Sequence, residues 1–178
     1  KNYHHKKESN LQETKDVKIL SQGFQLNEGA LAPDFNFKDS ENKTMRLSNF
    51  LGKRIVIYFY PRDFTPGCTT EAYEFSNQFN KYCEHDIMII GISPDDEKSH
   101  EKFREKMNIP FILASDTNHQ ISQKYGVYGL KKFMGKETMG VNRTTFLIDK
   151  DGKIEKIFHK VKPNGHSIEV LNYILKSN

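Results

Sequence analysis

The chain has 178 residues, of which 36% are apolar and 28% are charged, and its formal net charge is +4. This size and composition are typical of one soluble globular domain with a core of its own. No apolar run approaches the roughly 18 residues that a membrane span needs, and the basic residues are interspersed with acids. The sequence therefore favours neither a membrane nor a nucleic-acid partner.

Residues 1–26 offer almost nothing to bury, so we expect a flexible tail there, followed by one folded domain over residues 27–178. Two cysteines are too few for a disulfide framework, which favours a reducing intracellular compartment. Among such compartments, we expect the cytoplasm first. The nucleus or an organelle stays open, because the chain starts at Lys1 and we expect a segment upstream of it to be missing.

Short β-rich runs alternate with helical ones along the rest of the chain. Residues 55–60 and 87–92 are continuously apolar, which is typical of strands buried on both faces of a parallel sheet. Asp151-Gly152 predicts a hairpin between the last two strands. In chain order, the predicted strands are residues 35–38, 44–47, 55–60, 87–92, 111–113, 144–148 and 154–158.

Helical segments lie between these strands. After Cys68, four apolar residues recur at steps of three and four and form one stripe: Ala72, Phe75, Phe79 and Tyr82. Ser93 and Pro94 predict a helix from residue 93 to about 107, with Ser93 as its N-cap and Pro94 at its first position. Further helices are expected at 118–125 and 167–175. This order predicts an α/β domain with helices on both faces of the sheet.

Cys68 stands where a strand changes into a helix. The strand 55–60 ends at Pro61 and the helix begins near Pro66, so Cys68 lies in the first helical turn at the carboxyl end of a central strand. Unpaired backbone N–H groups and the helix dipole favour an anion at this place, and so favour a thiolate over a thiol. Thr65 can offer a hydroxyl across the same turn. The alternative is an inert buried thiol that happens to follow a turn.

The pattern Pro61-x-x-x-Thr65-x-x-Cys68 resembles the active-site motif of peroxiredoxins, and residues 61–72 resemble the peroxiredoxin Q/bacterioferritin comigratory protein (BCP) group. The resemblance extends from Gly29 to the C-terminus. It passes through Gly29-x-x-Ala32-Pro33-Asp34-Phe35, Ile90-Gly91-Ile92-Ser93, Tyr125-Gly126-Val127-Tyr128-Gly129, Lys132-Phe133-Met134-Gly135 and Arg143-Thr144-Thr145-Phe146-Leu147-Ile148-Asp149.

This resemblance implies a thioredoxin-like fold with a central mixed sheet and an N-terminal hairpin extension. It also implies thiol-dependent reduction of hydrogen peroxide and organic hydroperoxides, in antioxidant defence and redox homeostasis. Cys68 would be the nucleophile, Thr65 would hydrogen-bond the peroxide and the sulfur, and Arg143 would stabilise the thiolate and polarise the peroxide. Pro61 would shield the sulfur from water, and Glu71 would orient Arg143. The simpler alternatives are a surface ion pair for Arg143 and a first-turn acid favoured by the helix dipole for Glu71.

The chain departs from this group at the resolving cysteine. Many members carry one five residues after the nucleophile, where this chain has Tyr73. Cys83 follows Cys68 by fifteen residues, or roughly 22 Å along a continuous helix, whereas a disulfide requires Cα atoms about 4.4–6.8 Å apart. We therefore expect Cys83 to pack near the helix end. We also expect a one-cysteine mechanism, in which thioredoxin, glutaredoxin or glutathione reduces a Cys68 sulfenic acid.

Other motifs are weak. The seven histidines show no metal-ligand spacing, so we expect neither a metal nor another cofactor. Gly126-x-x-Gly129 with Lys131-Lys132 lacks the spacing of a phosphate loop and is interpreted as an active-site loop before Arg143. We expect a monomer. Two rival functions remain open. One is thioredoxin-type disulfide exchange, which requires a Cys-x-x-Cys motif, whereas this chain has Glu71 at the position of the second cysteine. The other is a non-catalytic peroxide-sensing relay or holdase.

Overall fold

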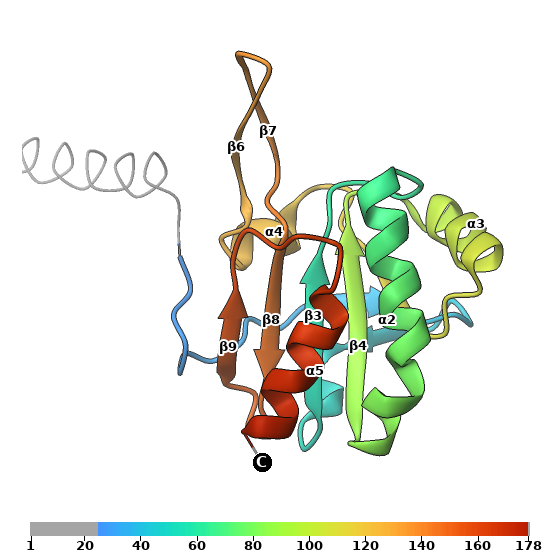
Figure 1. Ribbon diagram of the computed structural model, residues 1–178, viewed down its shortest axis with the longest axis vertical. Coiled ribbons are helices and arrows are strands. Elements are labelled where there is room, and N and C mark those ends of the chain that lie inside the picture. The colour runs from blue at the N-terminus through green and yellow to red at the C-terminus, as the bar shows by residue number, and fades with distance from the viewer. Residues whose placement is uncertain (1–24, 178) are drawn as a thin grey trace, which may run out of the picture.

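The computed structural model describes residues 25–177, and a five-stranded sheet in the order β5-β4-β3-β8-β9 forms its centre (Figure 1). The strands are β3 (Arg54–Phe59), β4 (Ile87–Ser93), β5 (Ile112–Ser115), β8 (Thr144–Ile148) and β9 (Ile154–Phe158). Two small antiparallel sheets accompany it: β1 (Asn36–Lys38) with β2 (Thr44–Arg46), and β6 (Tyr128–Phe133) with β7 (Lys136–Val141).

The central sheet is mixed, as the sequence predicts. β3 pairs in parallel with β4, and β4 with β5, whereas β8 runs antiparallel to both β3 and β9. Every residue of β3 is buried, because helices or loops cover both faces of the sheet. The register places Thr144 opposite Phe59, so β8 begins where β3 ends.

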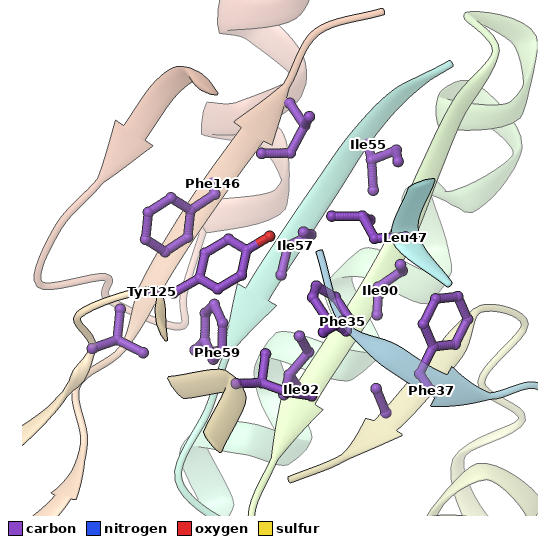
Figure 2. Close-up of a cluster of buried hydrophobic side chains, with 14 of the residues drawn as sticks. Phe35, Phe37, Leu47, Ile55, Ile57, Phe59, Ile90, Ile92, Tyr125 and Phe146 are labelled. Carbon is purple, nitrogen blue, oxygen red and sulfur yellow. The ribbon is translucent and has the colours of Figure 1, made fainter. Parts of the chain in front are cut away.

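Helices cover both faces. α2 (Pro66–Glu84) and α5 (His166–Lys176) lie side by side on one face, with α3 (Glu97–Met107) near the β5 edge (Figure 1). Their apolar side chains enclose one core with Tyr58, Phe75 and Leu147. The 3₁₀ helix η1 (Leu47–Phe50), the β1–β2 sheet and α4 (Gln120–Lys124) close the other face. Figure 2 shows that second core, where Phe35, Tyr125 and Phe146 pack against strand side chains.

The predicted start of the helix at residue 93 was wrong. Ser93 continues β4 and pairs with Ser115 of β5, and α3 begins only at Glu97. The N-cap is Asp96, whose side chain accepts a hydrogen bond from the Ser99 N–H at 2.8 Å. Pairing with β5 extends β4 through Ser93, although the local sequence pattern around Ser93 is typical of a helix N-cap.

The segment interpreted as a plain loop before Arg143 is instead a projecting hairpin. β6 and β7 stand away from the body and rise from the same end of the sheet as the first turn of α2 (Figure 1). Met134 and Gly135 form its two-residue turn, both with positive φ, of 50° and 78°. Asn and Gly are the residues usually found there, so Met134 concealed the turn.

The expected tail at residues 1–26 lies almost entirely outside the described residues, so the prediction of a flexible tail and a 27–178 domain remains a prediction. Over residues 25–177, no helix combines the length and apolar character that crossing a bilayer requires.

Candidate active site

A six-residue segment, residues 60–65, joins the end of β3 to the start of α2. Thr65 precedes it with an extended backbone, and Pro66 occupies the first helical position, where its missing N–H costs nothing. Cys68 is the third residue of the helix and only 1% of its surface is exposed. The prediction that Cys68 lies in the first helical turn, at the carboxyl end of a central strand, is confirmed.

Arg143 reaches Cys68 from a distant part of the chain. It stands between β7 and β8, and the antiparallel pairing of β8 with β3 brings it beside the start of α2. Its Nη2 donates to Cys68 Sγ at 3.2 Å. The contact places a permanent positive charge beside the sulfur. Arg143 also forms an ion pair, but its partner is the buried Glu71 and its own side chain is 19% exposed.

Glu71 lies beneath the guanidinium, one turn after Cys68. Its side chain is 1% exposed, and its Oε1 lies 3.5 Å from Arg143 Nη1. Burial raises the pKa of Glu71 to about 7, against the opposing effect of the Arg143 charge. Near neutral pH the carboxyl group is thus partly protonated, and it leaves part of the Arg143 charge uncompensated. Glu71 fixes the arginine without fully neutralising the field that the sulfur experiences.

Gly67 is a site residue that sequence reasoning missed. A Cβ atom added there would lie 2.8 Å from Arg143 Nη2 and 3.3 Å from Pro163 Cγ. Only a glycine therefore lets the guanidinium lie across the helix start and reach Cys68. A glycine inside a first helical turn, where better helix formers are available, was the signal that could have revealed it.

Thr65 and Pro61 flank the cysteine. Thr65 Oγ1 donates to the carbonyl oxygen of Arg62 at 2.9 Å. This bond uses the only hydrogen of the Thr65 hydroxyl, whose lone pairs can still accept a hydrogen bond. Pro61 lies two residues after the end of β3 and is partly buried. Both residues lie in the segment that leads into α2, as the sequence predicts.

Lys131 of β6 adds a second cation to the neighbourhood of Cys68. Its side chain lies across Gly140 of β7, with Cδ 3.1 Å from where a Cβ would stand. Burial and the nearby Arg143 charge lower the pKa of its ammonium group, whereas Cys68 raises it. The hairpin thus contributes positive charge near Cys68, in the segment that the sequence predicts to lie at the active site.

Cys83 lies at the other end of α2. The helix runs without a break from Pro66 to Glu84, so the two sulfur-bearing residues are separated by roughly 22 Å. Both cysteines are free, and Cys83 is exposed. The expected position at the helix end is confirmed, but the side chain does not pack as predicted, because it lies on the exposed side of the last turn, whereas the neighbouring Tyr82 is buried.

The sequence and the structure each match known proteins. The AhpC/TSA family pattern matches residues 29–157. Peroxiredoxin Bcp of Bacillus subtilis is 48% identical over 143 residues, covering 80% of this chain and 91% of that relative. Peroxiredoxin Bcp of Escherichia coli is 39% identical over 149 residues, covering 84% and 96%.

A solved structure shows the same arrangement of elements. It is the bacterioferritin comigratory protein of Xanthomonas campestris, studied for alkyl peroxide reduction. It superimposes with a TM-score of 0.76 at 33% identity, covering 80% of this chain and 91% of that one.

Proposed function

The chain belongs to the peroxiredoxin Q/BCP group of the AhpC/TSA family and is a thiol-dependent peroxidase, and from this premise we propose that Cys68 is its peroxide-attacking residue. The observation that carries this assignment is the 3.2 Å contact between Arg143 Nη2 and Cys68 Sγ. It pairs a buried sulfur at a helix N-terminus with a permanent cation.

The reaction follows from that geometry. The Cys68 thiolate attacks one peroxide oxygen in line with the O–O bond; an S–O bond forms as the O–O bond breaks. The sulfur is oxidised to a sulfenic acid, and the other oxygen leaves as water or an alcohol after taking a proton. Negative charge moves from sulfur to the leaving oxygen, so a fixed guanidinium stabilises the transition state more than a mobile solvent would.

The flanking residues support this step. The Thr65 hydroxyl has lone pairs left after its bond to Arg62 and hydrogen-bonds the bound peroxide. Pro61 keeps water from the sulfur, and Glu71 holds the Arg143 side chain in reach of Cys68. The described hydrogen bonds support the Glu71 role most directly.

The mechanism that we propose uses one cysteine. Cys83 is separated from Cys68 by a continuous helix, and unwinding four turns of helix to join them would be costly. An external thiol therefore reduces the sulfenic acid, with thioredoxin as first choice and glutaredoxin or glutathione as alternatives.

The two free cysteines fit a reducing intracellular compartment, and the cytoplasm is the compartment that we propose first. We also propose that the protein is a monomer.

One equivalent of peroxide should convert Cys68 to a sulfenic acid that dimedone traps and peptide mapping locates at residue 68. Stopped-flow mixing should show that this oxidation is fast, and adding thioredoxin, glutaredoxin or glutathione separately should identify which one sustains turnover. A Cys68–Cys83 disulfide formed within one molecule at high yield would overturn the one-cysteine mechanism.

Gly67→Ala should slow peroxide attack while leaving the protein folded. The new methyl group mainly displaces the flexible end of Arg143 and shifts Pro163 by a few tenths of an ångström, so the melting temperature should change little, but a misplacement of about 1 Å can cost about 100-fold in rate. Gly129→Ala is the matched control, because nothing lies closer than 3.6 Å to its Cβ position. Equal rates for Gly67→Ala and wild type would mean that the guanidinium contact is dispensable.

A further inference from the structure

A buried carboxylate anchors the segment that joins β3 to α2. Asp63 lies in the middle of this segment with 4% of its surface exposed. Tyr60 Oη donates to its Oδ1 at 2.6 Å, Ser99 Oγ donates to its Oδ2 at 2.9 Å, and His100 Nδ1 lies 2.7 Å from the same Oδ2. Because Ser99 and His100 belong to the first turn of α3, this helix holds the segment in place.

His100 bridges Asp63 and the central sheet. The ring is 1% exposed, and its Nε2 lies 3.1 Å from the carbonyl oxygen of Ala114 on β5. Asp63 is the closer of the two partners, at a short hydrogen-bonding distance of 2.7 Å from the ring. The pair connects the segment before α2 to the sheet.

Asp95 completes the anchor from the β4–α3 connection. Its Oδ2 accepts from the Asp63 N–H at 2.7 Å and from Ser93 Oγ at 2.6 Å. Ligand atoms of Asp63, Asp95 and His100 lie within 4.8 Å of one another, a spacing that could also hold a metal ion. Both carboxylate oxygens of Asp63, Oδ2 of Asp95 and both ring nitrogens of His100 already have hydrogen-bonding partners, so we interpret the cluster as an anchor made of hydrogen bonds.

The anchor holds a strained residue. Phe64, between Asp63 and Thr65, has a φ of 66°, which is costly for a bulky side chain. Its ring packs edge-on against Phe103 of α3, with centroids 5.0 Å apart. Phe103 is one turn beyond His100, so α3 grips both the carboxylate of Asp63 and the ring of Phe64. Strain that persists beside a reactive residue needs such external support.

Building on the proposed function, we propose that Asp63 and His100 are positioning residues for peroxide reduction, which hold the start of α2 so that Cys68 stays within reach of Arg143. Breaking the pair lets Phe64 relax to negative φ. The chain direction into α2 then changes at Thr65, three residues before the cysteine. Because the Cys68–Arg143 contact is a single 3.2 Å hydrogen bond, a shift of about 1 Å is enough to lose it.

The test compares two reactions of Cys68 in a Cys83→Ser background, where it is the sole thiol. His100→Ala should slow its oxidation by stoichiometric hydrogen peroxide by about 10- to 100-fold. The same variant should speed its alkylation by iodoacetamide, because the buried sulfur becomes accessible. His100→Asn, whose amide can donate to Asp63 from near the Nδ1 position, should recover part of both changes. A general loss of stability would also expose the sulfur and slow its oxidation, so both rates are measured well below the melting temperature of each variant and compared with a stability control.

Glu155→Gln is the control for stability. It disrupts the 2.7 Å ion pair with Arg54 at the opposite end of β3 and should leave both Cys68 rates unchanged. Wild-type rates in folded His100→Ala, or the same changes in Glu155→Gln, would overturn the proposal. Should His100→Ala fail to fold, Ser99→Ala removes only one donor to Asp63, and unchanged rates there would reject it. A wild-type protein inert to peroxide would refute the proposed function, whereas the alkylation rates would still decide the anchor.

Discussion

Cys68→Ser is expected to abolish peroxide consumption, whereas Cys83→Ser should retain nearly the full rate. A serine hydroxyl does not ionise near neutral pH and cannot reach a sulfenic acid state, so the reaction has no substitute nucleophile in the site. Cys83 is exposed and lies roughly 22 Å along α2 from Cys68. The measurement is peroxide disappearance with an excess of the preferred thiol reductant.

Folding must be checked in both variants, because Cys68 is packed inside the core formed by α2 and α5. Serine is close to cysteine in size, so circular dichroism should show an intact fold. Loss of turnover in well-folded Cys83→Ser would contradict the one-cysteine mechanism, and would mean that Cys83 takes part despite the length of the helix.

Arg143→Gln should slow peroxide attack by about 10²- to 10³-fold, the range typical of losing one preorganised donor to a developing anion. Two causes contribute. The thiolate loses a neighbouring charge, and the departing oxygen loses a donor that acts only in the transition state. The second cause persists at high pH, where Cys68 is fully ionised, so the rate should stay low there. Arg143→Lys should restore part of the charge effect without the forked geometry.

The two causes separate when the rate of Cys68 oxidation is followed against pH together with thiolate absorbance. If the oxidation rate of Arg143→Gln recovers fully at high pH, Arg143 acts only by promoting ionisation of the sulfur. A variant with unchanged absorbance and an unchanged rate would show that the 3.2 Å contact has no catalytic consequence.

The sequence predicted the central strands because their local pattern is strong. β3 and β4 are continuous apolar runs, and β8 and β9 were placed with their observed bounds. The start of α3 was misjudged because the pairing of Ser93 with Ser115 has no local signature. The β6–β7 hairpin was missed because most of its side chains are solvent-exposed, which leaves little apolar alternation to detect.

Sequence reasoning found the site only in part. A cysteine between a strand and a helix could be identified from local pattern, but Arg143 lies 75 positions further along the chain, and only the family resemblance indicated it. The Asp63–His100 pair was not foreseen at all. A buried polar pair depends on two segments meeting in space, and neither residue differs by its spacing from an ordinary surface acid or histidine.

The projecting β6–β7 hairpin has a chemical consequence of its own. It carries two thioethers into solvent, at Met134, which is 88% exposed, and at Met139, which is 53% exposed. In a protein that works in the presence of peroxide, these sulfurs are open to slow conversion to sulfoxides, which turn flexible apolar side chains into polar, chiral ones. The exposed methionines of the hairpin should therefore become progressively more polar as the protein is exposed to peroxide, even while Cys68 is regenerated after every turnover.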